Sequence, residues 1–368
     1  MKVPFVDLTS QLASIRPEVD RAVAEVLDRG AFVLGPGVAE FEEQFAPATG
    51  RRHAIGVNSG TSALHLALLA AGVGPGDEVV TTPHTWISTT WAISYVGATP
   101  VFADVDPVTG NLDPAAVEAV LTDRTRAILP VDLYGHPAPL VELERLAADR
   151  GVALVEDAAQ SHLATLDGRP AGSFGTLGCF SFYPGKNLGA VGEGGAVVTD
   201  DDELAARVRR LRDHAQDGRH HHVEVGYNYR MEGLQGAVLT VKLRHLQEWT
   251  DERRRAAARY AELLADVEQV TLPGVAEGVA PAWHLYPVRV ADRDTVAQKL
   301  AEAGIATGVH YPTPVHLQPA YEHLGHGPGS FPNAEQYAAT CLSLPMFPEL
   351  TAEQQEHVAT QLRSAVGG

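Results

Sequence analysis

One lysine, Lys186, lies in a setting that a solvent-exposed lysine does not need. It belongs to the stretch 180–190, Phe-Ser-Phe-Tyr-Pro-Gly-Lys-Asn-Leu-Gly-Ala. The aromatic and apolar residues predict a buried strand, and the flanking glycines allow a sharp turn close to a ligand. Burial disfavours the ammonium and lowers the lysine pKa, so a neutral amine able to form a Schiff base with an aldehyde becomes available. An ordinary surface loop explains this stretch alone equally well.

A carboxylate, Asp157, stands at the end of a second apolar run, residues 152–156. Parallel sheets bind ligands beyond the carboxyl ends of their strands. Pyridoxal phosphate needs an anion beside its ring nitrogen, because the protonated ring withdraws electrons from the substrate carbon. Such a contact is worth ~4 kcal/mol at an effective dielectric constant of ~20. A helix N-cap is the commoner role for an aspartate after a strand, but Lys186 further along favours the cofactor.

A third stretch, residues 57–64, reads Val-Asn-Ser-Gly-Thr-Ser-Ala-Leu between an apolar run and a leucine-rich helical pattern. Free N–H groups at a helix start, the positive end of its dipole and the hydroxyls of Thr61 and Ser62 can bind a phosphate beside Gly60. Serine and threonine before a helix are usually simple caps. The lysine, the carboxylate and Ser181 make the phosphate site the better interpretation.

Four motifs together resemble the DegT/DnrJ/EryC1/StrS family of sugar aminotransferases, in order over nearly the whole chain. They are Asn-Ser-Gly-Thr-Ser-Ala-Leu at 58–64, Val-Glu-Asp-Ala-Ala-Gln-Ser-His at 155–162, the lysine stretch at 180–190 and Gly-Tyr-Asn-Tyr-Arg-Met at 226–231. The resemblance implies an α/β fold of the fold type I PLP-dependent transferases. It also implies pyridoxal 5'-phosphate as cofactor and transamination as the reaction.

The family pattern implies a role for each matching residue. Lys186 would hold the cofactor and carry the proton, Asp157 would face the ring nitrogen and Gln160 the ring hydroxyl. Trp86 would stack on the ring, although an isolated tryptophan is more often part of a core. The phosphate would be bound by Gly60, Thr61, Ser62 and Ser181. Asn228 would reach the phosphate of a neighbouring subunit, so the protein is expected to be a homodimer with shared active sites.

A proline-rich stretch, 308–321, is expected to form a stiff loop that selects the substrate. Its His310 and Tyr311, together with Tyr183 and Arg230, are the candidate substrate contacts. The resemblance implies that an amino group moves from glutamate or glutamine to a nucleotide-linked keto-deoxysugar, in amino-sugar and antibiotic biosynthesis. A dTDP-3-keto-6-deoxyhexose aminated at carbon 3 is the preferred substrate.

Other functions share parts of this pattern. A 4-keto-sugar or keto-cyclitol aminotransferase would need every one of the cofactor residues. One branch of the family has histidine in place of the lysine and catalyses dehydration, which Lys186 argues against. A non-catalytic PLP-binding regulator would need a DNA-binding domain, and the sequence has no basic helix-turn-helix candidate.

Composition sets the class of protein. With 368 residues, 45% of them hydrophobic, the chain can form a large cofactor-binding domain, 1–246, and a smaller α/β domain, 247–368. A net charge of −18 argues against nucleic-acid and anionic-membrane partners. The absence of a long apolar run and of a signal peptide predicts a cytoplasmic protein. Cys179 and Cys341 alone predict neither a disulfide framework nor a metal-ligand cluster.

Strand-like and helix-like runs alternate through the first 160 residues, which predicts a mainly parallel sheet covered by helices. The expected strands are 77–82, 100–105, 126–131 and 152–156. Residues 232–266 contain no proline and glycine only near the start, which predicts one long helix that connects the two domains. A strand at 283–290 and helices at 296–303 and 351–366 are expected beyond it.

Overall fold

The computed structural model describes residues 1–367, and its largest element is a seven-stranded sheet of order β1-β9-β8-β5-β4-β2-β3. Strand β9 runs antiparallel to both of its neighbours, and all other neighbouring strands are parallel. The strands are β1 (His53–Val57), β2 (Glu78–Thr81), β3 (Thr99–Phe102), β4 (Thr125–Leu129), β5 (Ala153–Asp157), β8 (Leu177–Ser181) and β9 (Gly195–Thr199). The predicted α/β fold with a mainly parallel sheet is confirmed.

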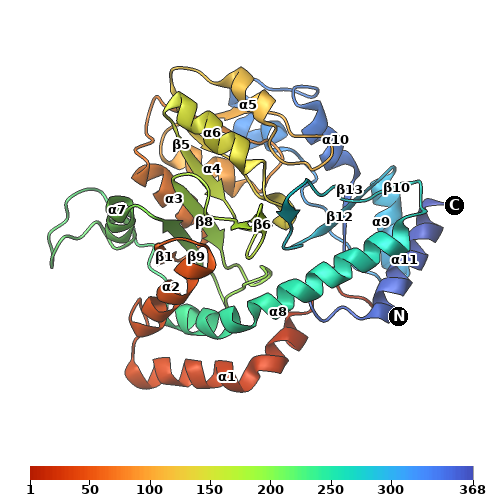
Figure 1. The fold of residues 1–368 in the computed structure, drawn as a ribbon, viewed down its shortest axis with the longest axis horizontal. Helices are drawn as coiled ribbons and strands as arrows, with labels where there is room; N and C mark the ends of the chain where they lie inside the picture. The colour runs from red at the N-terminus through yellow and green to blue at the C-terminus, as the bar shows by residue number, and fades with distance from the viewer. Residues whose placement is uncertain (368) are drawn as a thin grey trace.

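Helices cover both faces of this sheet (Figure 1). Successive strand residues point to opposite faces. Val79 packs in the cluster that contains α3, α4 and α7, whereas Val80 packs in the cluster with α5 and α6. Burial on both faces explains the unbroken apolar runs of these strands. The helices are α3 (Gly60–Ala70), α4 (Ser88–Tyr95), α5 (Pro114–Val120), α6 (Leu140–Arg150) and α7 (Asp202–Arg212).

Two further helices, α2 (Pro36–Ala48) and α8 (Gly233–Leu264), pack against the end of the sheet that holds β1, β9 and β8. The Phe45 ring packs edge-to-face with Phe180 and Phe182, at centroid distances of 5.1 and 5.2 Å. At Gly236, an added Cβ would lie 2.7 Å from the Cα of Val38, so only glycine permits this helix crossing. Helix α1 (Leu8–Arg29) packs alongside α8 (Figure 1).

The C-terminal part is built on the antiparallel sheet β10-β12-β13. Tyr260 and Leu264, near the end of α8, are buried in its core. Its elements are β10 (Val270–Thr271), β12 (Tyr286–Val290), β13 (Cys341–Leu344), α9 (Arg293–Glu302), α10 (Pro332–Thr340) and α11 (Ala352–Val366). A third small sheet joins β6 (Thr165–Leu166), β7 (Arg169–Pro170) and β11 (Val279–Ala280). Short 3-10 helices are η1 (Leu133–Gly135), η2 (Val315–Leu317) and η3 (Pro319–Leu324).

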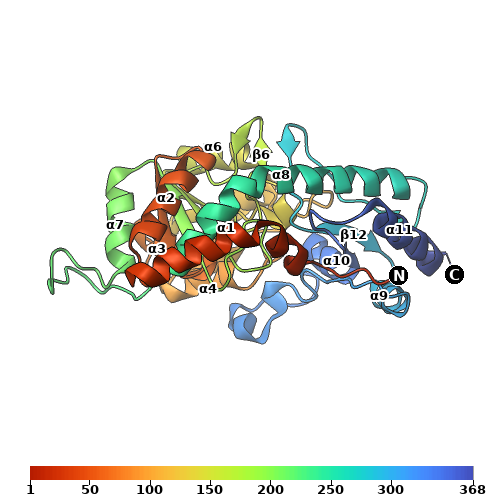
Figure 2. The ribbon, with the colours of Figure 1, turned by 90° about the horizontal axis from the view of Figure 1, so that it is seen from below.

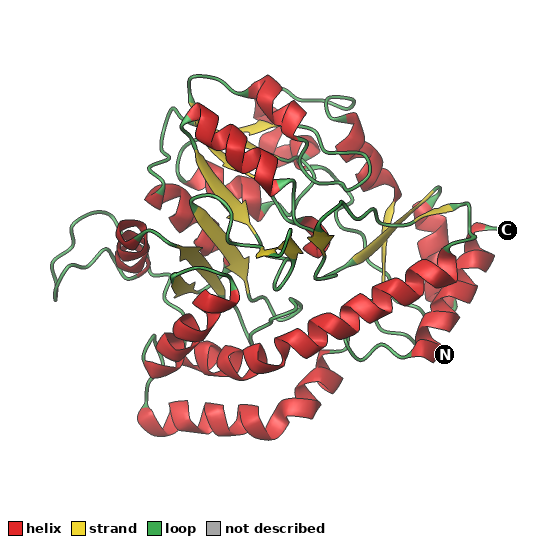
Figure 3. Ribbon diagram, in the orientation of Figure 1, coloured by secondary structure: helices red, strands yellow, loops and turns green. Residues whose placement is uncertain are grey.

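The predicted long helix is present as α8, which spans 32 residues and reaches from the large sheet to the small one (Figures 1 and 3). Residue 246, where the sequence places the domain boundary, lies inside this unbroken helix. The N-terminal segment reaches across as well, because Val3 pairs with Ile305 and packs in the C-terminal core. No helix within residues 1–367 combines the length and apolarity needed to cross a bilayer.

A long loop follows α7 and extends away from the body of the molecule, at the left of Figures 1 and 2. It contains residues 213–232, and its Val225 is 82% exposed. The loop returns to the sheet through a bridge between Val57 and Arg230.

Candidate active site

A cavity of about 630 Å³ lies beyond the carboxyl ends of β1, β2, β4, β5 and β8. Ten of the residues singled out in the sequence line it together: Gly60, Thr61, Trp86, Asp157, Gln160, Ser181, Tyr183, Lys186, His310 and Tyr311. Three others, Ser62, Asn228 and Arg230, do not line it. The strands thus gather at one place residues that are up to 251 positions apart in the chain.

Lys186 follows the end of β8, in a turn in which its N–H donates to the carbonyl of Tyr183 at 2.8 Å. Burial lowers the pKa of Lys186 to about 8, and the nearby Asp157 charge offsets part of that shift. About a tenth of such amines are neutral at pH 7, against fewer than about one in a thousand for a solvated lysine. The side-chain amine makes no hydrogen bond or ion pair within residues 1–367. It is therefore available to a ligand.

Asp157, the last residue of β5, presents its carboxylate to the same cavity. One oxygen accepts from the Thr89 hydroxyl at 2.8 Å and the other from the backbone N–H of Ala159 at 3.2 Å. Burial raises the pKa of Asp157, while these hydrogen bonds and Lys186 oppose the rise. A cation placed beside the carboxylate would favour its charged form. The site therefore fits a protonated ring nitrogen.

The start of α3 forms a cradle for an anion. The Ser59 hydroxyl caps the helix by accepting from the Ser62 N–H at 3.1 Å, which places Ser62 behind the cavity wall. The backbone N–H groups of Gly60 and Thr61 have no partner within residues 1–367. A Cβ on Gly60 would lie 2.6 Å from the Cβ of Ser181. The absence of a side chain at this position brings free N–H groups and a hydroxyl together, as a phosphate requires.

An aromatic wall lies opposite. Trp86 packs against Tyr311 with 5.4 Å between ring centroids, and it remains 55% exposed. Gln160 accepts from the backbone N–H of Tyr134 at 2.6 Å and donates to the Tyr311 hydroxyl at 3.1 Å. These bonds fix the orientation of the Gln160 amide and leave its second N–H for a ligand oxygen.

The predicted substrate contacts fall into two groups. His310 and Tyr311 line the cavity, as does Tyr183, which is 55% exposed. The His310 ring stacks on Phe5 and lies 2.9 Å from the Ser343 hydroxyl, and burial lowers its pKa to about 4. His310 is consequently neutral at pH 7.

Asn228 and Arg230 lie outside the cavity of their own chain, on the loop that follows α7. Arg230 forms an ion pair with Asp213 at 3.0 Å and donates to the Asn228 side chain at 3.1 Å. The expected contact of Asn228 with a neighbouring subunit stays a prediction.

Several lining residues escaped sequence analysis, among them Ser59, Thr89, Glu193, Arg253 and His284. Ser59 could have been found, because it stands at the predicted helix cap. Arg253 belongs to a charged helical run, and His284 precedes a strand in the C-terminal part. Nothing local in the sequence distinguishes either one from an ordinary surface residue.

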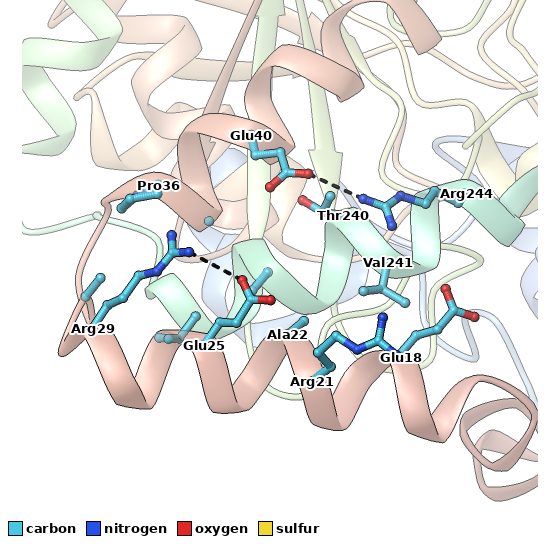
Figure 4. Close-up of a pocket in the computed structure, with 14 residues that line it drawn as sticks. Glu18, Arg21, Ala22, Glu25, Arg29, Pro36, Glu40, Thr240, Val241 and Arg244 are labelled. Atoms are coloured by element: carbon cyan, nitrogen blue, oxygen red, sulfur yellow. Dashed lines mark hydrogen bonds and ion pairs between the residues drawn. The ribbon is translucent and has the colours of Figure 1, made fainter.

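A second cavity, of about 330 Å³, lies between α1, α2 and α8 (Figure 4). We call it the α1–α8 groove. Four of its charged side chains pair within its own walls: Arg29 lies 3.6 Å from Glu25, and Arg244 lies 3.4 Å from Glu40. None of the residues singled out in the sequence lines it.

Comparison with known proteins identifies the family. The sequence model of the DegT/DnrJ/EryC1/StrS aminotransferase family matches residues 13–363. The chain belongs to this family. It is 44% identical to a "Pleiotropic regulatory protein" of Geobacillus stearothermophilus, over 98% of each chain. It is 46% identical to the "dTDP-3-amino-3,4,6-trideoxy-alpha-D-glucose transaminase" of Streptomyces venezuelae, over 98% of this chain and 96% of that one.

Solved structures agree. The crystal structure of S. venezuelae DesV, described as a complex with a ketimine intermediate, superposes with a TM-score of 0.97 at 46% identity, over 99% of this chain and 98% of that one. Of two further solved relatives, one is described in its PLP form and the other with PMP as the bound cofactor. The protein is a PLP-dependent aminotransferase, and pyridoxal 5'-phosphate is its cofactor. The predicted family, enzyme class and cofactor are confirmed.

Proposed function

We propose that the aminotransferase moves an amino group from glutamate or glutamine to carbon 3 of a dTDP-3-keto-6-deoxyhexose. The observation that carries the reaction is the buried Lys186 amine in one cavity with the Asp157 carboxylate. The preference for carbon 3 and for a dTDP carrier is supported by the S. venezuelae relative, whose name states a dTDP-3-amino product. Amino-sugar biosynthesis, as in the making of an antibiotic, is the corresponding pathway class.

When bound, pyridoxal phosphate supplies the electron-withdrawing ring that stabilises charge on the substrate carbon. Asp157 would keep the ring nitrogen protonated, and Gly60, Thr61 and Ser181, which line the cavity, would hold the phosphate end. The Lys186 amine, whose lowered pKa leaves a fraction of free base near neutral pH, would take a proton from the carbon of the amino donor in the first half-reaction and deliver a proton to the sugar carbon in the second. Because the amino donor leaves as its keto acid before the keto-sugar binds, the kinetics should be ping-pong.

The sugar would enter over the rim formed by Tyr183, His310 and Tyr311. A neutral His310 offers hydrogen bonds to sugar hydroxyls without adding charge. Arg230 is proposed to meet the diphosphate from a neighbouring subunit, because it does not line the cavity of its own chain.

We also propose a homodimer with shared active sites. The exposed Trp86, Tyr183 and Val191 present apolar surface, and no residue of the loop that carries Asn228 lines the cavity of its own chain. A second copy would cover the first and bring the Asn228 amide to the phosphate. The two cysteines, Cys179 and Cys341, are free thiols, which fits the cytoplasm.

Subunit mixing tests the shared site. Lys186→Ala and Asn228→Ala subunits are each expected to be inactive or weak as homodimers. A mixed dimer has one site with both residues intact, so activity should return on mixing and reassociation. If mixing restores nothing while mixed dimers are shown to form, the Asn228 contact across the interface is wrong.

Lys186→Ala tests the reaction itself. The variant should bind pyridoxal phosphate without a covalent bond and lose turnover by more than about a thousandfold, because it lacks the proton carrier. Borohydride reduction of the wild-type protein, followed by peptide mapping, should place the adduct on Lys186. Near-normal activity of the variant, or an adduct at another lysine, would overturn the assignment.

A substrate panel separates the remaining candidates. The dTDP-3-keto-6-deoxyhexose should be converted at least tenfold more efficiently, by kcat/KM, than a 4-keto-6-deoxyhexose or a keto-cyclitol. A reversed order would assign the enzyme to the corresponding alternative. A protein that binds the cofactor but aminates none of the three would favour the non-catalytic regulator.

A further inference from the structure

The imidazole of His284 is another polar group that lines the active-site cavity. The Nδ1 atom of this ring lies 3.2 Å from the side-chain oxygen of Asn187, the residue that follows the catalytic lysine. The amide nitrogen of Asn187 donates to the backbone carbonyl of Ala282 at 2.8 Å. Asn187 is only 2% exposed, so this arrangement has little competition from water.

The two contacts determine which ring nitrogen carries the hydrogen. A flipped Asn187 amide would put its oxygen against the Ala282 carbonyl, two acceptors face to face, so the orientation is fixed. The Asn187 oxygen can only accept, which requires a hydrogen on Nδ1 of His284. In the neutral ring, Nε2 then carries a lone pair and is an acceptor.

The Nε2 atom has no partner within residues 1–367, and it is not among the polar atoms that are sealed inside the protein. His284 itself lines the cavity. The pKa of His284 is lowered, first by burial and then by repulsion from neighbouring basic groups. These groups are Lys186, Arg253, His310 and His162. The ring is therefore neutral at physiological pH, with its lone pair available to a ligand in the cavity.

The backbone on either side of His284 is held as well. Arg253, buried in α8, donates from one nitrogen to the carbonyls of Trp283 at 3.1 Å, His284 at 3.4 Å and Met346 at 3.0 Å. A ring fixed through both its side chain and its backbone loses little entropy when it binds a ligand. This preorganisation is expected of a recognition group.

The geometry points to His284 as a substrate-recognition residue whose Nε2 accepts a hydrogen bond from an N–H or O–H group of the substrate. The inference rests on the proposed function and deepens it. The donor is either the ammonium of the amino acid or a hydroxyl of the keto-sugar, and the two half-reactions distinguish them. Asn187 acts as the positioning residue that fixes the tautomer.

Nitrogen NMR of the holoenzyme labelled with ¹⁵N-histidine tests the tautomer directly. His136 is an internal reference outside the cavity, because its Nε2 accepts from the Ala276 N–H at 3.0 Å and its Nδ1 lies 2.7 Å from the Pro137 carbonyl. Both rings should give the Nδ1–H pattern, and substrate should shift only the Nε2 signal of His284. An Nε2–H pattern for His284, or a His284 signal that neither substrate shifts, overturns the proposal.

Single-turnover kinetics then identify the donor. His284→Phe keeps the ring shape without the acceptor, and His284→Gln offers an amide oxygen in its place. His284→Phe should weaken substrate binding in one half-reaction only. The loss should be about 3- to 10-fold if the donor is a sugar hydroxyl and more than about 10-fold if it is the ammonium of the amino acid. His284→Gln should restore part of the lost affinity. The cofactor absorbance should not change. An equal loss in both half-reactions indicates a structural role and overturns the proposal.

Asn187→Asp provides a second route if His284→Phe fails to fold. A carboxylate beside Nδ1 raises the pKa of His284, and the protonated ring donates from Nε2 where it accepted before. The affected half-reaction should be slow at low pH and recover as pH rises and the ring loses its proton. A pH profile identical to that of the wild type contradicts the inference. Failure of the proposed function itself would be recognised separately, because Lys186→Ala would then retain activity.

Discussion

The two cavities of the molecule use charge in opposite ways. In the α1–α8 groove, Arg29 and Arg244 pair with Glu25 and Glu40, and all four side chains are more than half exposed. In the active-site cavity, the Lys186 side chain is partly buried, its amine is desolvated, and it has no ion pair within residues 1–367. Charges that already have partners and water gain little from a ligand, whereas a buried, unpaired one gains much. Burial without a partner therefore distinguishes the reactive site better than the number of charges does.

The largest difference between the cavities should appear in turnover. Asp157→Asn removes the anion proposed to hold the ring proton, an interaction worth ~4 kcal/mol at an effective dielectric constant of ~20, so kcat/KM should fall by about three orders of magnitude. Steady-state kinetics measures this. The matched control in the groove, Glu40→Gln, should leave kcat/KM unchanged. A fall of less than tenfold in Asp157→Asn would show that the carboxylate is dispensable.

Stability should reveal the cost of burying the lysine. The pKa of Lys186 is lowered from 10.5 to about 8 in the folded protein, so the unfolded chain binds the proton more tightly between these values. The buried charge therefore destabilises the cofactor-free protein below pH 8, by about 3 kcal/mol, and this cost fades as pH rises toward 10.5. Cofactor-free Lys186→Met should be more stable by that amount at pH 7.

The measurement is the free energy of unfolding in urea from pH 7 to pH 10. The advantage of Lys186→Met should shrink as pH increases. A difference that does not depend on pH would mean that hydrophobic packing, and not the buried charge, explains it.

The anion cradle should be sensitive to a single methyl group. The added Cβ of Gly60→Ala would lie 2.6 Å from the Cβ of Ser181, so the backbone must move at a cost of about 1–3 kcal/mol. The dissociation constant for pyridoxal phosphate should rise about tenfold or more, measured by titration of absorbance. Gly74→Ala is the matched control, since nothing lies within 4 Å of its added Cβ. Equal affinities in the two variants would exclude a tight cradle.

The smallest effect is expected in the groove. Arg244→Gln breaks the pair with Glu40, but both side chains are more than half exposed, so the free energy of unfolding should change by less than about 0.5 kcal/mol. Urea unfolding of the variant and the wild type measures it. A loss above 1 kcal/mol would remove the contrast between the two cavities.

The fold was largely predictable because its strands are buried on both faces and its longest helix has no proline. The direction of β9 was not, since an apolar run such as Gly195–Thr199 has the same composition in either orientation. The strands β6, β7 and β11 have two residues each, which is too short for any periodicity. The division at residue 246 stays a prediction, because α8 passes through it.

Site residues could be predicted where they belong to short sequence motifs, as Lys186 and Asp157 do. They could not be predicted where function depends on contacts made after folding. Arg253 reaches the carbonyl of Met346, and Asn187 reaches the ring of His284, across 93 and 97 positions of the chain. Leu163 has a left-handed backbone conformation, with a φ of 60°, that its residue type does not predict.

Helix α8 contributes buried side chains to both ends of the protein: Leu239 and Leu246 at one end and Tyr260 and Leu264 at the other. If the chain were cut within this helix, the piece that keeps the helix would expose apolar surface. The other piece would lack part of its core. Neither piece is then a self-sufficient unit. Heating the intact chain should accordingly melt both ends in one cooperative step, and the enzyme should resist being dissected into separately expressible halves.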